Sequence, residues 1–269
     1  MEKVTTGGRI VNVPTDLEEL EPKQYKYLLF LSSQLAAGNI DLEFYRLRLF
    51  SFLLGFDGVN YTILKADRIA EIERQLPKLN DFLKPSRTAD GPVLRVDIET
   101  TRNLLPEYHR YKGPGDWLNG VTFGEFVECI TDIETLAEIA RTSGGDIDPE
   151  ALRESYNHIA RVLYHIPSED RVPDILAYHA PTLFATVWRA IQSGPIEING
   201  RNIDFSIIFK GTGNGKPDDK TGWTGITFEV ASANVFGNVA DVEAADLWAV
   251  LLYLYKCKFE YNHDKNNTK

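Results

Sequence analysis

Cysteine is scarce in this 269-residue sequence, which contains only Cys129 and Cys257. Two cysteines cannot build the disulfide framework of a small secreted protein, so a reducing compartment is expected. Both residues lie in or beside apolar helical patterns, where a cysteine usually serves as a small buried hydrophobe. The sequence also has no Cys-x-x-Cys pair, the spacing that is typical of zinc and redox sites.

Long hydrophobic runs are absent as well. The longest apolar stretch, residues 247–255, is far shorter than the roughly 20 residues that span a bilayer. Residues 1–9 contain no apolar segment of the kind found in secretory signals. These absences predict a cytoplasmic protein with no membrane partner.

Positive charge is in deficit, since 29 Lys and Arg stand against 39 Asp and Glu and give a net charge of −10. Binding to a phosphate backbone requires clustered Lys and Arg, so this balance disfavours a nucleic-acid partner. It suits a protein partner with a basic face. With 43% apolar and 25% charged residues, the composition is that of a globular protein with a sizeable core.

Motifs for catalysis or metal binding are missing too. There is no Gly-x-Ser-x-Gly elbow and no His-Glu-x-x-His helix. His158 and His165 lie seven residues apart on one predicted helix, which separates them by about 10 Å along its axis. Zinc ligands usually lie three to five residues apart, so these histidines, with His179 further along the chain, predict no metal site.

Two loops resemble ligand-binding motifs but lack essential residues. An acidic loop resembles a calcium site, yet Ala151 replaces the required glycine and Asn157 replaces the final glutamate. A glycine-rich loop resembles a phosphate site, yet Lys210 stands at the first glycine and Pro217 at the magnesium-binding Ser or Thr. No cofactor is therefore predicted. An enzyme whose site is assembled only in three dimensions is left as an alternative.

Most of the chain shows the apolar periodicity of amphipathic helices, bounded by capping residues, prolines and glycines. The predicted helices begin after Thr15 and cover residues 22–38, 41–55, 66–76, 122–144, 149–166, 181–194, 225–234 and 242–255. The last is apolar on nearly all sides and is expected at the centre of the fold. The polar run 262–269 after it is expected to fray.

Strand-like alternation is confined to short segments. It occurs over residues 8–13 and 93–98, and again over 196–198 and 203–209, where Asn199-Gly200 predicts a hairpin turn. The predicted fold is mainly α, a helical bundle with a short N-terminal strand and a β-hairpin insertion near 196–209.

The predicted organisation has three regions, or alternatively one continuous domain. Residues 1–84 form an N-terminal helical region with a leading strand, and residues 122–269 form a C-terminal helical region with the hairpin. Between them, residues 85–121 form a mixed linker that contains a strand and is rich in proline and glycine turns.

Three aromatic residues beside predicted turns are candidate protein contacts: Trp117, Phe123 and Trp223. Trp and Tyr are enriched at the centres of protein interfaces. The alternative is a core role, because Tyr108, Tyr111 and Trp117 surround a Gly-Pro turn, where aromatics often cover a core.

Four groups of short motifs follow one another along most of the chain. They are Val13-Pro14-Thr15-Asp16-Leu17-Glu18-Glu19-Leu20 with Pro22-Lys23-Gln24-Tyr25; Tyr111-Lys112-Gly113-Pro114-Gly115-Asp116 with Leu118 and Thr122-Phe123-Gly124-Glu125-Phe126; Leu163-Tyr164; and Gly222-Trp223, Phe228, Val230-Ala231, Val235-Phe236-Gly237 and residues 248–254. Together they resemble a family from phages and prophages of Bacteroidetes that is encoded among tail genes and regarded as tail-assembly-chaperone-like. The sequence departs from that pattern at Leu17, where Trp is expected, and at Leu163-Tyr164, which lacks an Arg-Pro.

The resemblance implies a non-enzymatic protein that holds a tail component, such as the tape-measure protein, during assembly in the host cytoplasm. An apolar groove with an acidic rim would accept a helix of that partner. One alternative is a structural virion protein of the neck, connector or tail, in which segment 196–222 supplies an interface. A third possibility is an enzyme or a host-directed effector. The partners would be other phage proteins or further copies of this chain.

Overall fold

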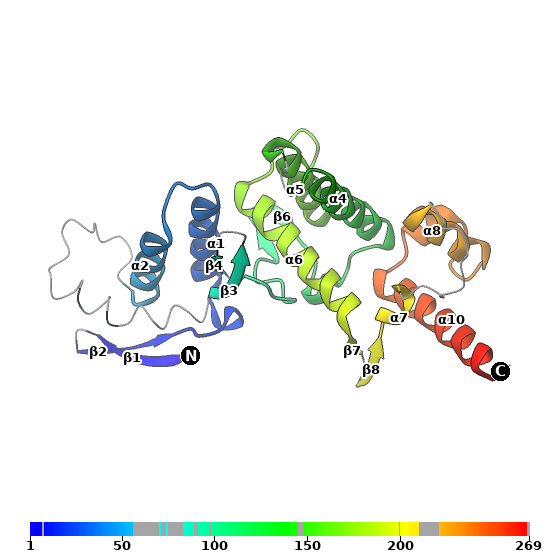
Figure 1. The fold of residues 1–269 in the computed structure, drawn as a ribbon, viewed down its shortest axis with the longest axis horizontal. Coiled ribbons are helices and arrows are strands. Elements are labelled where there is room, and N and C mark those ends of the chain that lie inside the picture. Colours follow the sequence, from blue (N-terminus) through cyan, green and yellow to red (C-terminus); the bar gives the residue numbers. More distant parts are fainter. Residues whose placement is uncertain are drawn as a thin grey trace. The chain divides into compact units, whose positions relative to one another are not determined.

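Figure 1 shows the computed structural model of the chain, which describes residues 1–6, 8–55, 70, 74, 83–88, 91–96, 98–144, 148–198, 200–209 and 221–267. The chain divides into two compact units, Met1–Leu105 and Pro106–Lys269. Helices dominate, and the strands form small two-stranded antiparallel sheets, which confirms the predicted fold class. Among the described residues, none of the helices is long and apolar enough to cross a membrane.

The first unit begins with a β-hairpin rather than a single strand. β1 (Glu2–Thr6) pairs antiparallel with β2 (Arg9–Val13), so that the predicted strand has a partner that its own pattern did not indicate. Burial of Val4 and Val13 fixes which face of this hairpin points inward. The helix predicted after Thr15 is a single 3-10 turn, η1 (Leu17–Glu19).

Two helices follow as an antiparallel pair, as their patterns predict. α1 (Pro22–Ala36) starts at a proline, and α2 (Leu42–Leu53) is capped by the Asp41 side chain, which accepts a hydrogen bond of 2.7 Å from the Phe44 amide. β3 (Leu83–Thr88) and β4 (Gly91–Val96) form the next hairpin. The helix predicted over 66–76 lies outside the described residues, apart from two helical positions at 70 and 74.

The second unit opens with a small hairpin, β5 (Glu107–Tyr108) and β6 (Tyr111–Lys112), followed by the 3-10 turn η4 (Asp116–Leu118). Three long helices come next, α4 (Phe123–Thr142), α5 (Pro149–Tyr164) and α6 (Asp174–Ser193). α5 packs against both of the others. The start of α4 is the predicted capping box, with reciprocal hydrogen bonds between Thr122 and Glu125 of 2.8 and 3.2 Å.

The prediction that Pro181 begins a helix is wrong, because α6 starts seven residues earlier and contains this proline. A proline inside a helix costs roughly 3 kcal/mol. The stripe formed by Leu176, Ala180, Leu183 and Phe184 is almost fully buried, and burying that surface outweighs the local penalty.

The hairpin near residue 200 is present, but its second strand is shorter than predicted. β7 (Pro195–Ile198) pairs with β8 (Arg201–Asp204). The strand ends at Asp204, whose carboxylate accepts a 3.0 Å hydrogen bond from the Ser206 amide. The short helix α7 (Ser206–Phe209) follows directly. Phe205 is fully buried, so the segment forms part of the core.

The chain ends in α8 (Gly222–Ser232), α9 (Val239–Glu243) and α10 (Leu247–Asn267). α10 differs from the prediction at both ends, because it starts at Leu247 and continues through the polar run that was expected to fray. Only its first part is central. Leu247, Val250 and Leu251 are buried, whereas Phe259 is 54% exposed. Its apolar residues are concentrated in the first turns, where the buried ones lie on one face of the helix.

The two cysteines differ in burial. Cys129 on α4 is buried, as predicted, and burial raises the pKa of its thiol well above the usual value. Cys257 lies on the exposed part of α10, so the expectation of burial is wrong for this residue.

A close contact at Gly113 joins two motif segments of the second unit. The Gly113 amide donates to the Pro106 carbonyl at 2.9 Å. A β-carbon at Gly113 would lie 2.5 Å from Cε1 and Cζ of Tyr164, whose side chain is fully buried at the end of α5. Only glycine fits beneath this ring without displacing it.

We expect Gly113→Ala to lower the free energy of unfolding by about 1–3 kcal/mol, because the added methyl group overpacks the Tyr164 ring. The measurement is urea unfolding followed by circular dichroism. Gly194→Ala is the matched control, since a β-carbon there meets nothing within 4 Å and the backbone is extended. Equal stability of the two variants would contradict the prediction.

Candidate functional site: a tryptophan-lined pocket

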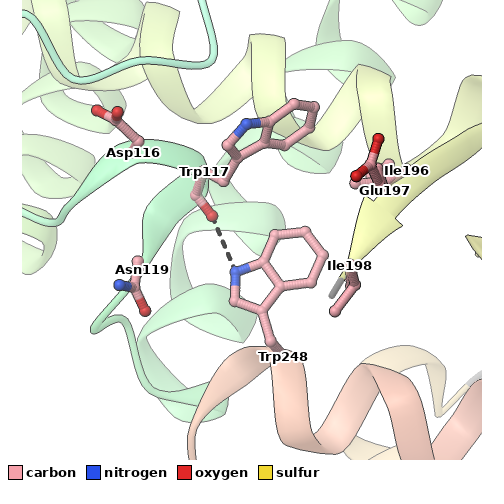
Figure 2. A pocket seen from close by; sticks show the side chains of 7 residues that line it. All are labelled: Asp116, Trp117, Asn119, Ile196, Glu197, Ile198 and Trp248. Carbon is pink, nitrogen blue, oxygen red and sulfur yellow. Dashed lines mark hydrogen bonds between the residues drawn. The ribbon is translucent and has the colours of Figure 1, made fainter. Parts of the chain in front are cut away.

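The second unit contains a cavity of about 320 Å³ formed by three elements distant in sequence (Figure 2). The turn η4, strand β7 and the first turn of α10 contribute its walls. The lining residues are Asp116, Trp117, Asn119, Ile196, Glu197, Ile198 and Trp248.

The turn at the pocket holds two adjacent non-glycine residues in the left-handed region. Trp117 has φ 58° and ψ 31°, and Leu118 has φ 57°. Each such residue costs roughly 1–2 kcal/mol relative to a right-handed conformation. Two main-chain hydrogen bonds close the turn, from the Asn119 amide to Asp116 and from the Gly115 amide to Asn119. Complete burial of Leu118 offsets part of the cost.

Trp248 fixes this turn from the other side of the pocket. Its indole Nε1 donates a 3.0 Å hydrogen bond to the Trp117 carbonyl, 131 residues earlier in the chain (Figure 2). The Trp248 ring also lies 5.7 Å from the ring of buried Phe205. One indole therefore supports the strained backbone and forms a wall of the cavity at the same time.

The start of α10 is held in place by the segment that leads into α4. The Phe123 amide donates to Ala245 at 2.8 Å, and the Leu247 amide donates to Val121 at 3.1 Å. A β-bridge between Thr122 and Asp246 lies between these two bonds. Main-chain hydrogen bonds therefore fix the position of Trp248, and these bonds change little with the rotamers of nearby side chains.

The pocket combines apolar walls with acidic groups. The two indoles and Ile196 and Ile198 supply apolar surface, while Asp116 and Glu197 are exposed. Figure 2 shows Asp116 and Asn119 on one side of the indoles and β7 on the other. The lining residues that the structure describes include no Ser, Thr, Cys, His or Lys. Chemically, this combination can accommodate an apolar or amphipathic group.

The three predicted contact residues lie in different surroundings. Trp117 is half-buried and lines the pocket. Phe123 is fully buried and Trp223 is 9% exposed, and their ring centroids lie 6.2 Å apart. Trp223 Nε1 donates to a Glu134 carboxylate at 3.2 Å. Phe123 and Trp223 therefore have almost no surface to offer a partner in this conformation.

Phe123 and Trp223 belong to an aromatic cluster that fills the core of the second unit. Neighbouring ring centroids in this cluster lie 5.0 to 6.4 Å apart, within the range of favourable ring contacts. The members are Phe123, Phe126, Phe184, Trp188, Phe209 and Trp223.

Sequence reasoning missed most of the pocket. Trp248 sits in a strongly apolar segment, which favours a core position, and no local pattern relates it to Trp117. Glu197 and Ile198 belong to a predicted hairpin whose neighbours are set by the tertiary fold. The one available signal is the presence of both Asp116 and Trp248 in the family-like motifs.

Two of the three candidate metal histidines connect α5 to α4. His158 Nδ1 lies 2.6 Å from an Asp132 carboxylate oxygen, and His165 Nδ1 lies 3.4 Å from Glu125. His179 is buried in α6. Across the described part of the chain, no three His, Cys, Asp or Glu residues are grouped so that they could hold a metal ion.

The two incomplete loop motifs are only partly covered by the structure. Asp148, from the calcium-like segment, caps α5, with its carboxylate accepting a 3.2 Å hydrogen bond from the Glu150 amide. This is the predicted helix cap. Residues 210–220, which contain the phosphate-like motif, lie outside the described residues.

Comparisons of the chain with protein-family models, with curated proteins and with solved structures find no match. The resemblance to the phage family therefore rests on the motifs quoted above.

His179 makes stability depend on pH. Burial lowers the pKa of this imidazole from 6.5 to about 3. The folded state therefore remains neutral at His179 between these pH values, while the unfolded chain takes up a proton. Above pH 6.5 His179 is neutral in both states and does not change the free energy of unfolding. Below pH 6.5 the free energy of unfolding falls by up to about 1.4 kcal/mol per pH unit, because only the unfolded chain binds the proton.

We expect His179→Gln to flatten the acid side of the stability profile. The measurement is the free energy of urea unfolding of both proteins at several pH values from 7.5 to 4.5. The carboxylates titrate in both proteins, so the difference between the two slopes reports His179 alone. We expect this difference to correspond to about one proton bound by the unfolded chain. Parallel profiles would contradict the assignment.

Proposed function

We propose that this chain is a non-enzymatic binding protein whose second unit holds a segment of a partner protein in the Trp117–Trp248 pocket. The observation that carries this proposal is the strained turn at the pocket wall. Two adjacent non-glycine residues in the left-handed region persist only where the surrounding structure imposes them, and such strain clusters at ligand clamps and functional sites. A turn with no role beyond connecting two elements could use glycine at no such cost.

The size and chemistry of the pocket favour a protein side chain as its occupant. A cavity of about 320 Å³ lies at the lower end of the roughly 300–1,000 Å³ typical of small-molecule sites. Its lining is mainly aromatic and aliphatic with a few polar groups, as at the anchor positions of protein interfaces.

We further propose that the partner is a phage tail component, such as the tape-measure protein, held during assembly in the host cytoplasm. Two of the family-like motif segments contribute lining residues, Asp116 and Trp248, and a third is bonded to the start of α10 through the Phe123 amide and the Ala245 carbonyl. Residues 111–116 lead into η4, residues 122–126 begin α4, and residues 248–254 begin with Trp248. The net charge of −10 suits a partner with a basic face.

A structural virion protein is the second candidate, and the hairpin is the observation that favours it. Among the strands that the structure describes, β7 pairs only with β8, so strand addition by another subunit is a possible contact. Deleting segment 196–222 would not separate the two candidates. The deletion removes Ile196, Glu197 and Ile198 from the pocket and buried Phe205 from the core.

Quantitative mass spectrometry separates the two candidates. Gradient-purified particles are compared with lysate of the same infected cells. We expect the chain to be abundant in lysate and absent from particles, as a protein that acts only during assembly would be. A fixed number of copies in every particle would contradict this role and favour the structural one.

The pocket itself is tested by two matched Trp→Phe substitutions. Trp248→Phe removes the donor to the Trp117 carbonyl, and Trp223→Phe removes the donor to the Glu134 carboxylate, away from the pocket. We expect the first to reduce co-purification of tagged chain with its partner about 10-fold, a loss of about 1.4 kcal/mol. The second should leave co-purification unchanged at temperatures where both variants are folded. Equal capture by both variants would exclude the pocket as the binding site.

A further inference from the structure

The charged groups of the pocket are all of one sign. Asp116 and Glu197 contribute carboxylic acids and Asn119 contributes an amide, and the lining residues that the structure describes include no Lys, Arg or His. Asp116 and Glu197 lie on opposite sides of the indole pair in Figure 2. A phosphate or carboxylate entering between them would meet like charges, which disfavours an anionic ligand.

The aromatic walls favour the opposite sign of ligand charge. Trp is the best aromatic partner for a cation, because the faces of its indole ring carry negative potential. The Nε1 of Trp248 is already bonded to the Trp117 carbonyl at 3.0 Å, so the positive edge of this indole is occupied within the protein.

The aliphatic wall suits the stem of a long basic side chain. Ile196 is 8% exposed and Ile198 is half-buried, and Glu197 lies between them on β7. Lys and Arg bury their methylene stems along apolar surface while the charged head stays near water or a counter-charge. A stem along the isoleucines would bring the head within the field of the carboxylates and indoles.

We propose that the pocket binds the side chain of a lysine or arginine in the partner segment. This inference rests on the proposed function and specifies the chemistry of the residue that the pocket accepts. Three features of the described lining residues support it: two indoles, two carboxylates, and an aliphatic wall. The acidic net charge of the chain attracts such a partner at longer range.

The test is a peptide titration of the full chain followed by NMR. The probes are short capped peptides of serine and threonine with one central lysine, arginine, norleucine or glutamate. The indole N–H signals of the four tryptophans report where each peptide binds. We expect the lysine and arginine peptides to bind about 10-fold more tightly than the norleucine peptide. They should shift the signals of Trp117 and Trp248 more than those of Trp188 and Trp223.

Norleucine has the stem of lysine without the charge, so equal binding by this peptide would overturn the cationic preference. The proposed binding of a partner protein would stand in that case, since its co-purification test is separate. Cadaverine, a free diamine, distinguishes the source of the cation. Tighter binding of cadaverine than of the lysine peptide would indicate a small-molecule site and overturn the inference, as would absence of binding by every peptide.

A matched pair of charge variants tests the carboxylates. Asp116→Asn with Glu197→Gln neutralises the pocket, and Glu154→Gln with Glu229→Gln removes the same charge from exposed positions on α5 and α8. We expect the first pair to reduce the preference for lysine over norleucine about 5-fold or more, and the second pair to preserve it. The same preference in both pairs would exclude recognition of a cation by these carboxylates.

Discussion

The second unit depends on the hydrogen bonds that tie the start of α10 to the residues before α4. The Phe123 amide bonds to Ala245 and the Leu247 amide to Val121, so the first turns of two helices far apart in sequence are fixed to each other. Because these are main-chain bonds, they depend on backbone conformation more than on side-chain identity. Trp248 follows directly and reaches the Trp117 carbonyl from a fixed position. Without this junction, neither the strained turn nor the cavity beside it would have a defined shape.

The four tryptophans of the second unit lie in two different surroundings. Trp188 and Trp223 lie in the aromatic cluster, where ring contacts fill the core between α4, α6 and α8. Trp117 and Trp248 remain half-buried and line the cavity. A pocket whose walls are fixed by main-chain and indole hydrogen bonds is the arrangement expected of a preorganised site, because little conformational entropy is lost when a ligand enters.

Capping residues in the sequence correctly predicted the helix starts that are fixed by a side-chain capping bond. Asp41, Thr122 and Asp148 each cap the helix that follows, since a capping bond spans only two or three residues. Predictions failed where distant packing outweighed a local preference. Pro181 lies inside α6 because its helix face is buried, and β1 pairs with β2 although its own sequence has no strand pattern. At Asp204 the opposite occurred, because a short-range side-chain bond ended a strand that alternation alone would have extended.

The sequence by itself determined the mainly α class, the hairpin turn at Gly200 and the approximate boundaries of α1, α2, α4 and α5, because periodicity and capping act over a few residues. It also indicated Trp117 as a candidate contact beside a turn. Only the tertiary structure separated Trp117 from Phe123 and Trp223, which fill the core, and joined it instead to Trp248 and Glu197. Burial and the meeting of three distant segments arise from the packing of the whole unit, and no local pattern encodes which aromatic side chain remains at the surface.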